Sequence, residues 1–125
     1  IKPVEWETWV SDTYTNRNFE STVIGFDAAT LSAGALLNRW MSDNDKNMIN
    51  YNNPEYDKVM QEANASTDDA KQTELYKQAA AMLSETAANV YIQDLADFVL
   101  LKNNLDGYQF YPLYVMDLST VHYVQ

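Results

Sequence analysis

Two helix starts decide the fold of this chain, Asn53-Pro54-Glu55-Tyr56-Asp57 and Ser66-Thr67-Asp68-Asp69. In the first, Asn53 can cap the helix, Pro54 suits the first helical position, and the acidic side chains lie at the positive end of the helix dipole. The second start has the same arrangement of capping and acidic residues. Apolar residues follow at helical spacing, namely Tyr56, Val59, Met60 and Ala63, then Leu75, Ala79, Met82 and Leu83. We therefore predict two consecutive helices, the second ending near Thr86.

The chain before Asn53 predicts shorter elements. Apolar residues fall at helical intervals over 5–14, which predicts a short helix, although their residue types leave a strand open. The β-branched and aromatic residues of 19–26 predict a buried strand, with a bend or a close backbone approach at Gly25. Residues 27–34 are small and polar, which predicts a loop that leads into a helix around 35–41.

An Asn- and Asp-rich segment, residues 42–53, predicts an ordered connection. Beyond Ala88 short apolar runs are separated by the turn signals Asn103-Asn104 and Asp106-Gly107, which predicts mostly strand and loop. The runs are Val90-Tyr91-Ile92, Phe98-Val99-Leu100-Leu101, Leu113-Tyr114-Val115 and Val121-His122-Tyr123-Val124. Helices and strands are thus mixed, which predicts an α/β or mixed α+β fold with helices on a mixed sheet.

Length and composition indicate one acidic domain without cysteine. A chain of 125 residues that is 46% hydrophobic has the apolar content to fold as one domain. A formal net charge of −10 disfavours nucleic acid and anionic membrane surfaces as partners. The absence of cysteine excludes disulfides, thiolate nucleophiles and cysteine-ligated metal sites, and it leaves the cellular compartment open.

Catalytic and metal-binding patterns are weak. His122 is the single histidine and no Gly-x-Ser-x-Gly elbow occurs, so we expect no Ser-His-Asp triad and place His122 on a sheet face. The segment 43–47 resembles the opening of a calcium loop, but Met48 stands where a glycine is needed and Pro54 where a glutamate is needed. We therefore predict a solvated Asx-rich turn there. Carboxylate pairs are plentiful, but nothing selects one as a glycosidase pair. No catalytic residue, metal ligand or cofactor is predicted.

Aromatic residues are numerous for a core this small, with three Trp, nine Tyr and four Phe. Flat amphipathic rings suit a cleft that holds varied ligands, and packing in the core is the alternative for each of them. The candidates for a cleft are Trp6, Trp9, Phe26, Trp40, Tyr51, Tyr108, Phe110, Tyr111 and Tyr114.

Several segments together resemble a known family. In chain order they are Gly25-Phe26-Asp27, residues 50–57, residues 74–79, Val90-Tyr91-Ile92 and Leu105-Asp106-Gly107-Tyr108. This series resembles the C-terminal part of the family 5 extracellular solute-binding proteins, the oligopeptide and dipeptide receptors of ABC importers. The resemblance covers nearly the whole chain but only the last portion of such receptors. It implies that residues 1–125 are a single C-terminal domain or lobe portion, a fragment of a type II periplasmic-binding-protein fold.

The resemblance also implies a binding site. In peptide-binding members the segment that matches 25–32 runs along the cleft, where a Gly-aromatic pair precedes an acid that accepts the peptide α-ammonium, followed by an acidic-Pro pair. Here the aromatic is Phe26, the position of the acid holds Ala29, and Ser32-Ala33 replaces the acidic-Pro pair. We expect Phe26, Asp27, Ala28 and Ala29 to contact the ligand. Asp27 either replaces the missing carboxylate or caps the following turn.

The function implied is non-catalytic capture of a peptide for the transmembrane subunits of an ABC permease. A receptor of the same fold for a sugar or a chelated metal is an alternative, and a hydrolase or a stand-alone interaction module is another. The chain opens at Ile1 without an initiator Met or a signal segment. We therefore expect a longer extracellular polypeptide, anchored by an upstream lipoprotein segment or free in the periplasm. The 125 residues alone are expected to expose apolar surface that self-association would cover.

Overall fold

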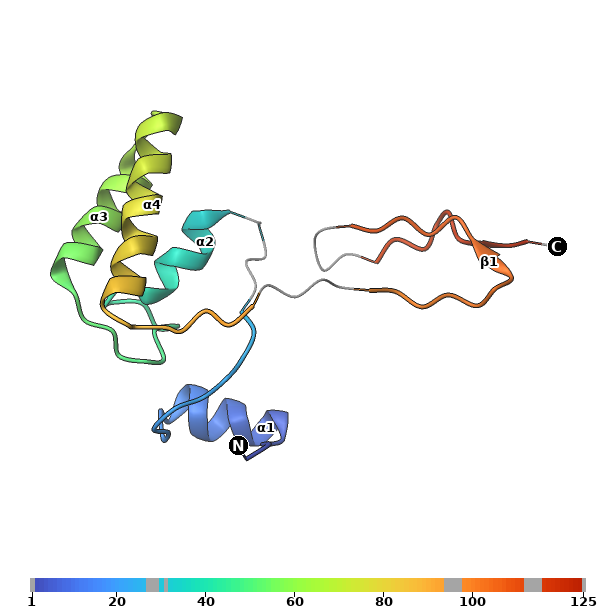
Figure 1. Ribbon diagram of the computed structural model, residues 1–125, viewed down its shortest axis with the longest axis horizontal. Coiled ribbons are helices and arrows are strands. Elements are labelled where there is room, and N and C mark those ends of the chain that lie inside the picture. Colours follow the sequence, from blue (N-terminus) through green and yellow to red (C-terminus); the bar gives the residue numbers. More distant parts are fainter. Residues whose placement is uncertain (1, 27–29, 31, 94–97, 112–115, 125) are drawn as a thin grey trace. The chain divides into compact units, whose positions relative to one another are not determined.

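The computed structural model describes residues 2–26, 30, 32–93, 98–111 and 116–124. The chain divides into two compact units, Ile1–Val90 and Tyr91–Gln125. Among the described residues, the first unit holds the helices and the second holds a small two-stranded sheet (Figure 1). This mixture confirms the predicted α/β, mixed α+β class. The assignment of residues 1–125 to one C-terminal lobe portion stays a prediction.

Helices α3 (Pro54–Ala65) and α4 (Asp69–Glu85) confirm the two predicted starts. The side chain of Asn53 accepts hydrogen bonds from the backbone N–H groups of Glu55 and Tyr56 at 3.1 and 3.3 Å. The side chain of Asp68 accepts one from the N–H of Lys71 at 2.9 Å. These bonds satisfy N–H groups that have no partner inside the helix, so each helix begins where its cap lies. The two helices pack side by side (Figure 1).

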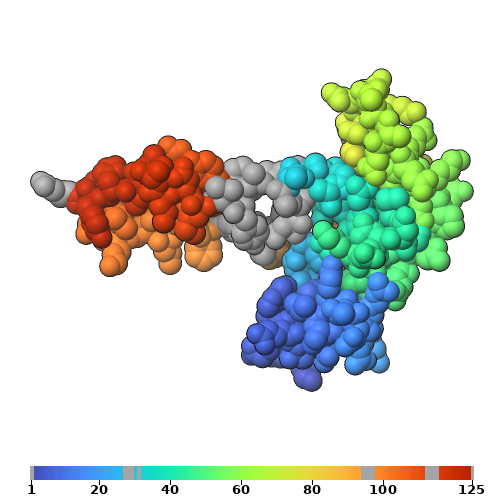
Figure 2. Space-filling view, turned by 180° about the vertical axis from the view of Figure 1, so that it is seen from behind, coloured from blue at the N-terminus to red at the C-terminus, as the bar shows by residue number. Residues whose placement is uncertain are grey.

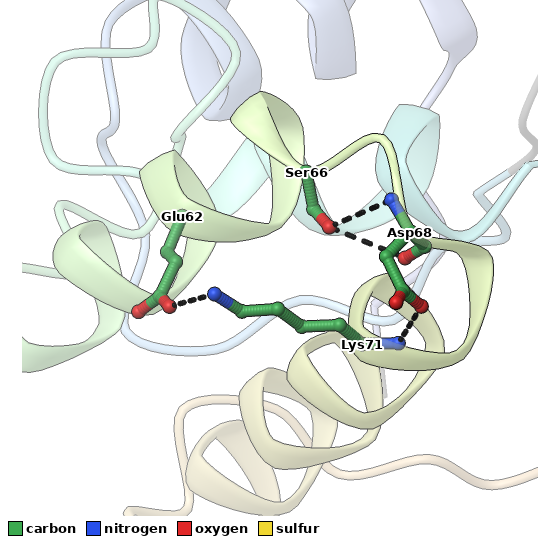
Figure 3. Close-up of polar contacts among 4 residues, drawn as sticks. All are labelled: Glu62, Ser66, Asp68 and Lys71. Carbon is green, nitrogen blue, oxygen red and sulfur yellow. Dashed lines mark hydrogen bonds and ion pairs between the residues drawn. The ribbon is translucent and has the colours of Figure 1, made fainter.

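A tight turn joins α3 to α4 (Figure 3). The Ser66 hydroxyl lies 3.2 Å from both the backbone N and the backbone O of Asp68, accepting from one and donating to the other. Across the turn Lys71 Nζ lies 2.7 Å from Glu62 Oε1. This hydrogen bond lowers the pKa of the Glu62 carboxyl and raises the pKa of the Lys71 ammonium. Because both side chains are exposed, the pair orients the helix ends and adds little stability.

The core of the first unit lies between α3, α4 and the short helix α2 (Ala33–Leu37), which continues as the 3₁₀ helix η2 (Asn38–Trp40). Tyr56, Met60, Ala79 and Leu83 are fully buried, and Trp40 is 3% exposed. In the space-filling view α2, in cyan, and α3 and α4, in green to yellow-green, form one packed body (Figure 2). The predicted helix around 35–41 is confirmed, and it begins at Ala33.

The connection between η2 and α3 is ordered, as predicted, because Asn47 and Met48 are buried in it. The Asn47 amide donates to the carbonyl oxygens of Met41 and Tyr51 at 3.1 and 2.8 Å, and its oxygen accepts from the Tyr51 N–H at 3.0 Å. An Asx turn is present, since the Lys46 N–H donates to Asn44 Oδ1 at 2.9 Å. The prediction that this turn is solvated is wrong for Asn47, which is only 3% exposed.

The first predicted helix is confirmed, but it changes type along its length. A single turn of α-helix, α1 (Trp6–Thr8), continues as the π-helix η1 (Trp9–Thr15). The wider turn is visible at Asn16, whose backbone N–H donates to the Ser11 carbonyl, five residues earlier, at 3.0 Å. Periodicity alone does not separate these two helix types, because both repeat within a fraction of a residue of each other.

The predicted strand over 19–26 is wrong. These residues are neither helix nor strand, although exposure alternates along 21–26 as it does in a strand. Thr22, Ile24 and Phe26 are partly buried, whereas the residues between them are exposed. A strand needs a neighbour for its ladder of hydrogen bonds. No other described segment pairs with 19–26, so the two-residue period is present without a sheet.

The second unit has one pair of strands, β1 (Leu105–Asp106) and β2 (His122–Tyr123). They are antiparallel, with Leu105 opposite Tyr123 and Asp106 opposite His122. Gly107 ends β1 with a φ of 84°, a conformation that suits glycine. The prediction of a strand at 121–124 is confirmed over two residues, and the predicted turn at Asn103-Asn104 is confirmed.

Other strands predicted for this part of the chain are wrong. Residues 90–92 and 98–101 form no strand. Val90 and Leu100 are 82% and 87% exposed, so these two apolar side chains are largely unpacked in the described structure. An apolar run predicts a strand only where a partner covers it. The predicted run 113–115 lies outside the described residues.

The end of α4 gives a testable effect on stability. Ala88 N–H donates to the Leu83 carbonyl at 3.0 Å and Ala87 N–H to the Ser84 carbonyl at 3.1 Å, which is the Schellman arrangement. Ala87 has a φ of 52°, where glycine is favoured.

We expect Ala87→Gly to raise the free energy of unfolding by about 0.5–1 kcal/mol, because glycine removes the Cβ strain at the left-handed position. Urea unfolding followed by circular dichroism measures the change. Ala81→Gly, at an exposed position inside α4, is the matched control and should lower stability by about 1 kcal/mol. A loss of stability in Ala87→Gly would contradict the assigned helix end.

Candidate functional site

Phe26 is the residue of the predicted binding site that the structure describes. It is partly buried, and it packs against the core cluster of the first unit. Asp27, Ala28 and Ala29 lie outside the described residues. The site is therefore built from Phe26 and from the elements on either side of the predicted loop.

Two side chains of η2 hold the Phe26 ring. The Trp40 ring meets it edge to face, with ring centroids 5.7 Å apart and an interplanar angle of 83°. Arg39 Cζ lies 4.4 Å from the centroid of the Phe26 ring, within the range of a cation–π interaction. Since Trp40 is itself buried, Phe26 rests on a rigid support and keeps part of its ring exposed.

The segment that leads to Phe26 is anchored at two further points. Trp9 Nε1 donates to Thr22 Oγ1 at 2.9 Å, and Ile24 packs against the core cluster. After the predicted loop, Ser32 caps α2 by accepting from the Ala35 N–H at 3.2 Å, and its hydroxyl lies 3.1 Å from that of Thr30. The chain on both sides of residues 27–29 is thus fixed by packing and hydrogen bonds.

Three of the nine candidate cleft aromatics, Trp9, Trp40 and Tyr51, have structural roles. Trp9 and Trp40 are buried in the core. Tyr51 is partly buried, and its hydroxyl lies 3.0 Å from the Thr86 hydroxyl and accepts from the Asn53 amide at 2.9 Å. In the second unit Tyr108 and Tyr111 are partly buried and Phe110 is exposed; Tyr114 lies outside the described residues.

Trp6 is the exception in the first unit, being 64% exposed. It stacks on Trp9 with ring centroids 5.3 Å apart and an interplanar angle of 13°. Together with Glu7, Val10 and Ser11 it lines an open hollow of about 430 Å³ along α1 and η1. An aromatic wall with a polar rim can accept an apolar group, and Glu7 is the charged residue in this lining.

Two titratable groups of the second unit, His122 and Asp117, make hydrogen bonds in the described structure. His122 lies on β2, as predicted, with its Nδ1 3.0 Å from the Thr120 carbonyl oxygen. The Ser119 backbone N–H, 2.9 Å from Asp117 Oδ1, lowers the pKa of the Asp117 carboxyl. Within residues 2–26, 30, 32–93, 98–111 and 116–124, no three histidine, aspartate and glutamate side chains gather as a metal site. In the same ranges no helix is long and apolar enough to cross a membrane.

Arg39 and Thr22 are the supporting residues that the sequence did not point to. Arg39 lies thirteen positions after Phe26 and Trp9 lies thirteen before Thr22, so neither contact leaves a local pattern. A basic residue beside Trp40 in a predicted helix was the sole indication of the first, and it predicts a solvated side chain equally well.

No family model matches the chain. Two curated relatives are similar to most of it. The probable deoxycholate-binding periplasmic protein YgiS of Escherichia coli (strain K12) is 28% identical over 108 residues, which are 86% of this chain and 20% of the relative. The periplasmic oligopeptide-binding protein OppA of Haemophilus influenzae is 30% identical over 104 residues, 83% of this chain and 19% of the relative.

The chain thus spans about a fifth of the length of the curated relatives it matches. It is similar to part of periplasmic solute-binding proteins, and both relatives are named as binding proteins rather than enzymes. The finer assignment to family 5 stays a prediction.

Proposed function

We propose that this chain is part of a periplasmic or extracellular solute-binding protein, which captures a small solute without chemical change and delivers it to an ABC permease. One observation carries the proposal: a supported, partly exposed Phe26 lies directly before the predicted ligand loop in a chain similar to part of two binding proteins. Delivery to transmembrane permease subunits and anchoring by an upstream lipoprotein segment belong to the same proposal.

A peptide is the ligand class that we favour. Along the segment 21–26 exposed and partly buried residues alternate, as they do in a strand with one packed face. The segment pairs with no described strand. An extended peptide can add to such a segment through main-chain hydrogen bonds, with alternate side chains facing the protein. Phe26 would offer its ring to an apolar side chain of the peptide.

A non-peptide solute is the second candidate, and two observations favour it. Ala29 stands where peptide-binding members have an acid, and one of the two relatives is named for deoxycholate rather than for a peptide. An amphipathic molecule with a large apolar surface would use Phe26 without needing a carboxylate partner. A sugar or a chelated metal remains in the same class.

Thermal unfolding of the full polypeptide that contains this chain tests the proposal. Panels of free tripeptides and longer peptides, sugars, metal chelates and deoxycholate should include a ligand that raises the Tm. A ligand at 100 times its Kd adds about 2.7 kcal/mol to the free energy of unfolding. The ligand should be recovered unchanged. Turnover of the ligand would support a hydrolase, and no shift with any member would contradict ligand capture by this protein.

A substitution at Asp27 tests the hypothesis that the ligand is a peptide with a free α-ammonium group. We expect Asp27→Ala in the full polypeptide to weaken binding of a free-amino tripeptide by at least about tenfold, because a buried ammonium loses its charge-assisted partner. Isothermal titration calorimetry measures the Kd. The same variant should leave binding of the N-acetylated tripeptide unchanged.

Asp27→Asn separates the two roles left open for this residue. Asparagine caps a turn as well as aspartate does, but it carries no charge. If Asp27 binds the ammonium, Asp27→Asn should weaken binding of the free-amino tripeptide as much as Asp27→Ala does. Wild-type affinity in both variants would contradict a role for Asp27 in binding the ammonium.

A further inference from the structure

The first unit contains a second candidate site, which is polar and whose lining does not include Phe26. It is a hollow of about 210 Å³, which we call the Arg17 hollow, and it is lined by Arg17, Ser42, Asn44, Asn47, Asn50, Tyr51 and Asn52. Its lining residues carry guanidinium, hydroxyl and amide groups, with Tyr51 as the aromatic member. Such a lining suits a small polar group rather than an apolar one.

Two residues of the hollow, Arg17 and Asn50, have a left-handed backbone conformation and are hydrogen bonded to each other. Arg17 follows η1 with a φ of 56°, and Asn50 has a φ of 52°. Arg17 Nη1 donates to Asn50 Oδ1 at 2.5 Å. The left-handed region is tolerated by asparagine but is disfavoured for arginine, and such strain is concentrated at functional sites. The hydrogen bond to Asn50 orients the guanidinium toward the connection.

Arg17 forms no ion pair with the described residues. Over the described residues the ion pairs are Glu62 with Lys71 and Glu74 with Lys77, and Arg17 takes part in neither. The carboxylate of Asp57, on α3, is engaged by Ser42, whose backbone N–H donates to it at 2.9 Å and whose hydroxyl also donates to it. An exposed guanidinium has five N–H groups, and the bond to Asn50 is the one that the described structure gives for Arg17.

The floor of the hollow is rigid. Asn47 is 3% exposed, and both ends of its amide are hydrogen bonded to the backbone of the connection. Asn44, which also lines the hollow, accepts from the Lys46 N–H through its Oδ1 at 2.9 Å, and its NH₂ group remains a donor. The hollow therefore presents donors on a fixed frame.

We propose that the Arg17 hollow binds a carboxylate group. A guanidinium fork matches the two oxygens of a carboxylate, and amide donors at the rim add hydrogen bonds to the same oxygens. The small volume restricts the occupant to a short organic acid or to the side chain of an aspartate or glutamate in a neighbouring polypeptide. The site is separate from Phe26, so it does not depend on the proposed transport role.

Nitrogen-15 NMR of the full polypeptide that contains this chain tests this at constant ionic strength. Sodium succinate should give saturable shifts of the backbone amides of residues 17, 44, 50 and 52, and acetamide should give none. The blocked peptide acetyl-Ala-Glu-Ala-amide, compared with its Gln counterpart, tests the polypeptide source. Binding of succinate alone identifies a small acid as the occupant, and binding of the Glu peptide identifies a side chain.

Two variants and a control decide the role of Arg17. Arg17→Gln should weaken the binding by at least about tenfold, since the shorter amide side chain carries no charge and no guanidinium fork. Asn50→Asp should weaken it to a similar degree, because the new carboxylate pairs with Arg17 in place of the ligand. Lys58→Gln removes one positive charge from an exposed position of α3 and should leave the binding unchanged. Non-saturable shifts, or equal binding by wild type and Arg17→Gln, would overturn the proposal.

Discussion

Tyr56→Ala should lower the free energy of unfolding by about 3–5 kcal/mol, the range observed when a large buried aromatic is truncated. Tyr56 is fully buried at the meeting point of α3 and α2. Its hydroxyl donates to the Leu37 carbonyl at 2.7 Å, and its ring meets that of Tyr51 edge to face at 5.5 Å. Truncation removes the packing of a whole ring and leaves a buried carbonyl without its donor. Urea unfolding followed by tryptophan fluorescence measures the loss.

Tyr56→Phe is the matched control, because it keeps the ring and removes the hydroxyl. It should cost about 1–3 kcal/mol, the range for a buried acceptor left without its donor. If Tyr56→Ala were no more destabilising than Tyr56→Phe, the ring would not be packed in the core as the structure has it.

Asn47→Ala should lower the free energy of unfolding by about 2–3 kcal/mol, because three backbone groups each lose a hydrogen bond from the buried Asn47 side chain, and the Met41 carbonyl alone keeps a second donor, the Asn44 N–H. The groups are the carbonyl oxygens of Met41 and Tyr51 and the N–H of Tyr51. The variant should also loosen the connection that frames the Arg17 hollow. Chemical denaturation measures the stability, and hydrogen exchange of the Tyr51 amide should become faster.

Asn44→Ala is the control within the same connection. The Asn44 side chain accepts one hydrogen bond, from the Lys46 N–H, in a less buried position. Its loss should cost less than about 1 kcal/mol. Equal effects of the two substitutions would contradict the assignment of Asn47 as the buried centre of this connection.

Local chemistry explains which elements the sequence predicted well. The starts of α3 and α4 depend on Asn53 and Asp68, whose caps act on residues two or three positions away. The strand expected at 19–26 failed for the opposite reason, since a strand depends on a neighbour that no local pattern identifies. Exposure still alternates along 21–26, as the two-residue period of the sequence predicts. No described segment is hydrogen bonded to it as a neighbouring strand.

In the candidate site too, local features were predictable from the sequence, whereas contacts between distant residues were not. Phe26 was identified through the resemblance of Gly25-Phe26-Asp27 to a known family, and the structure adds Trp40 and Arg39 as its support. Asn47 was assigned to a solvated turn because asparagine is common in turns. Its burial depends on three backbone groups that meet it only in the folded connection, so spacing alone could not predict it.

Capture of a solute at Phe26 is tested most directly by the affinity of the full polypeptide for the panel member that raises its Tm most. Calorimetric titration should show saturable binding, and Phe26→Ala should weaken it by at least about tenfold, through loss of the aromatic contact. Val23→Ala, at a neighbouring position that is 77% exposed, is the control and should bind as wild type does. Equal affinity of Phe26→Ala and wild type, or no saturable binding at all, would contradict a ligand site at Phe26.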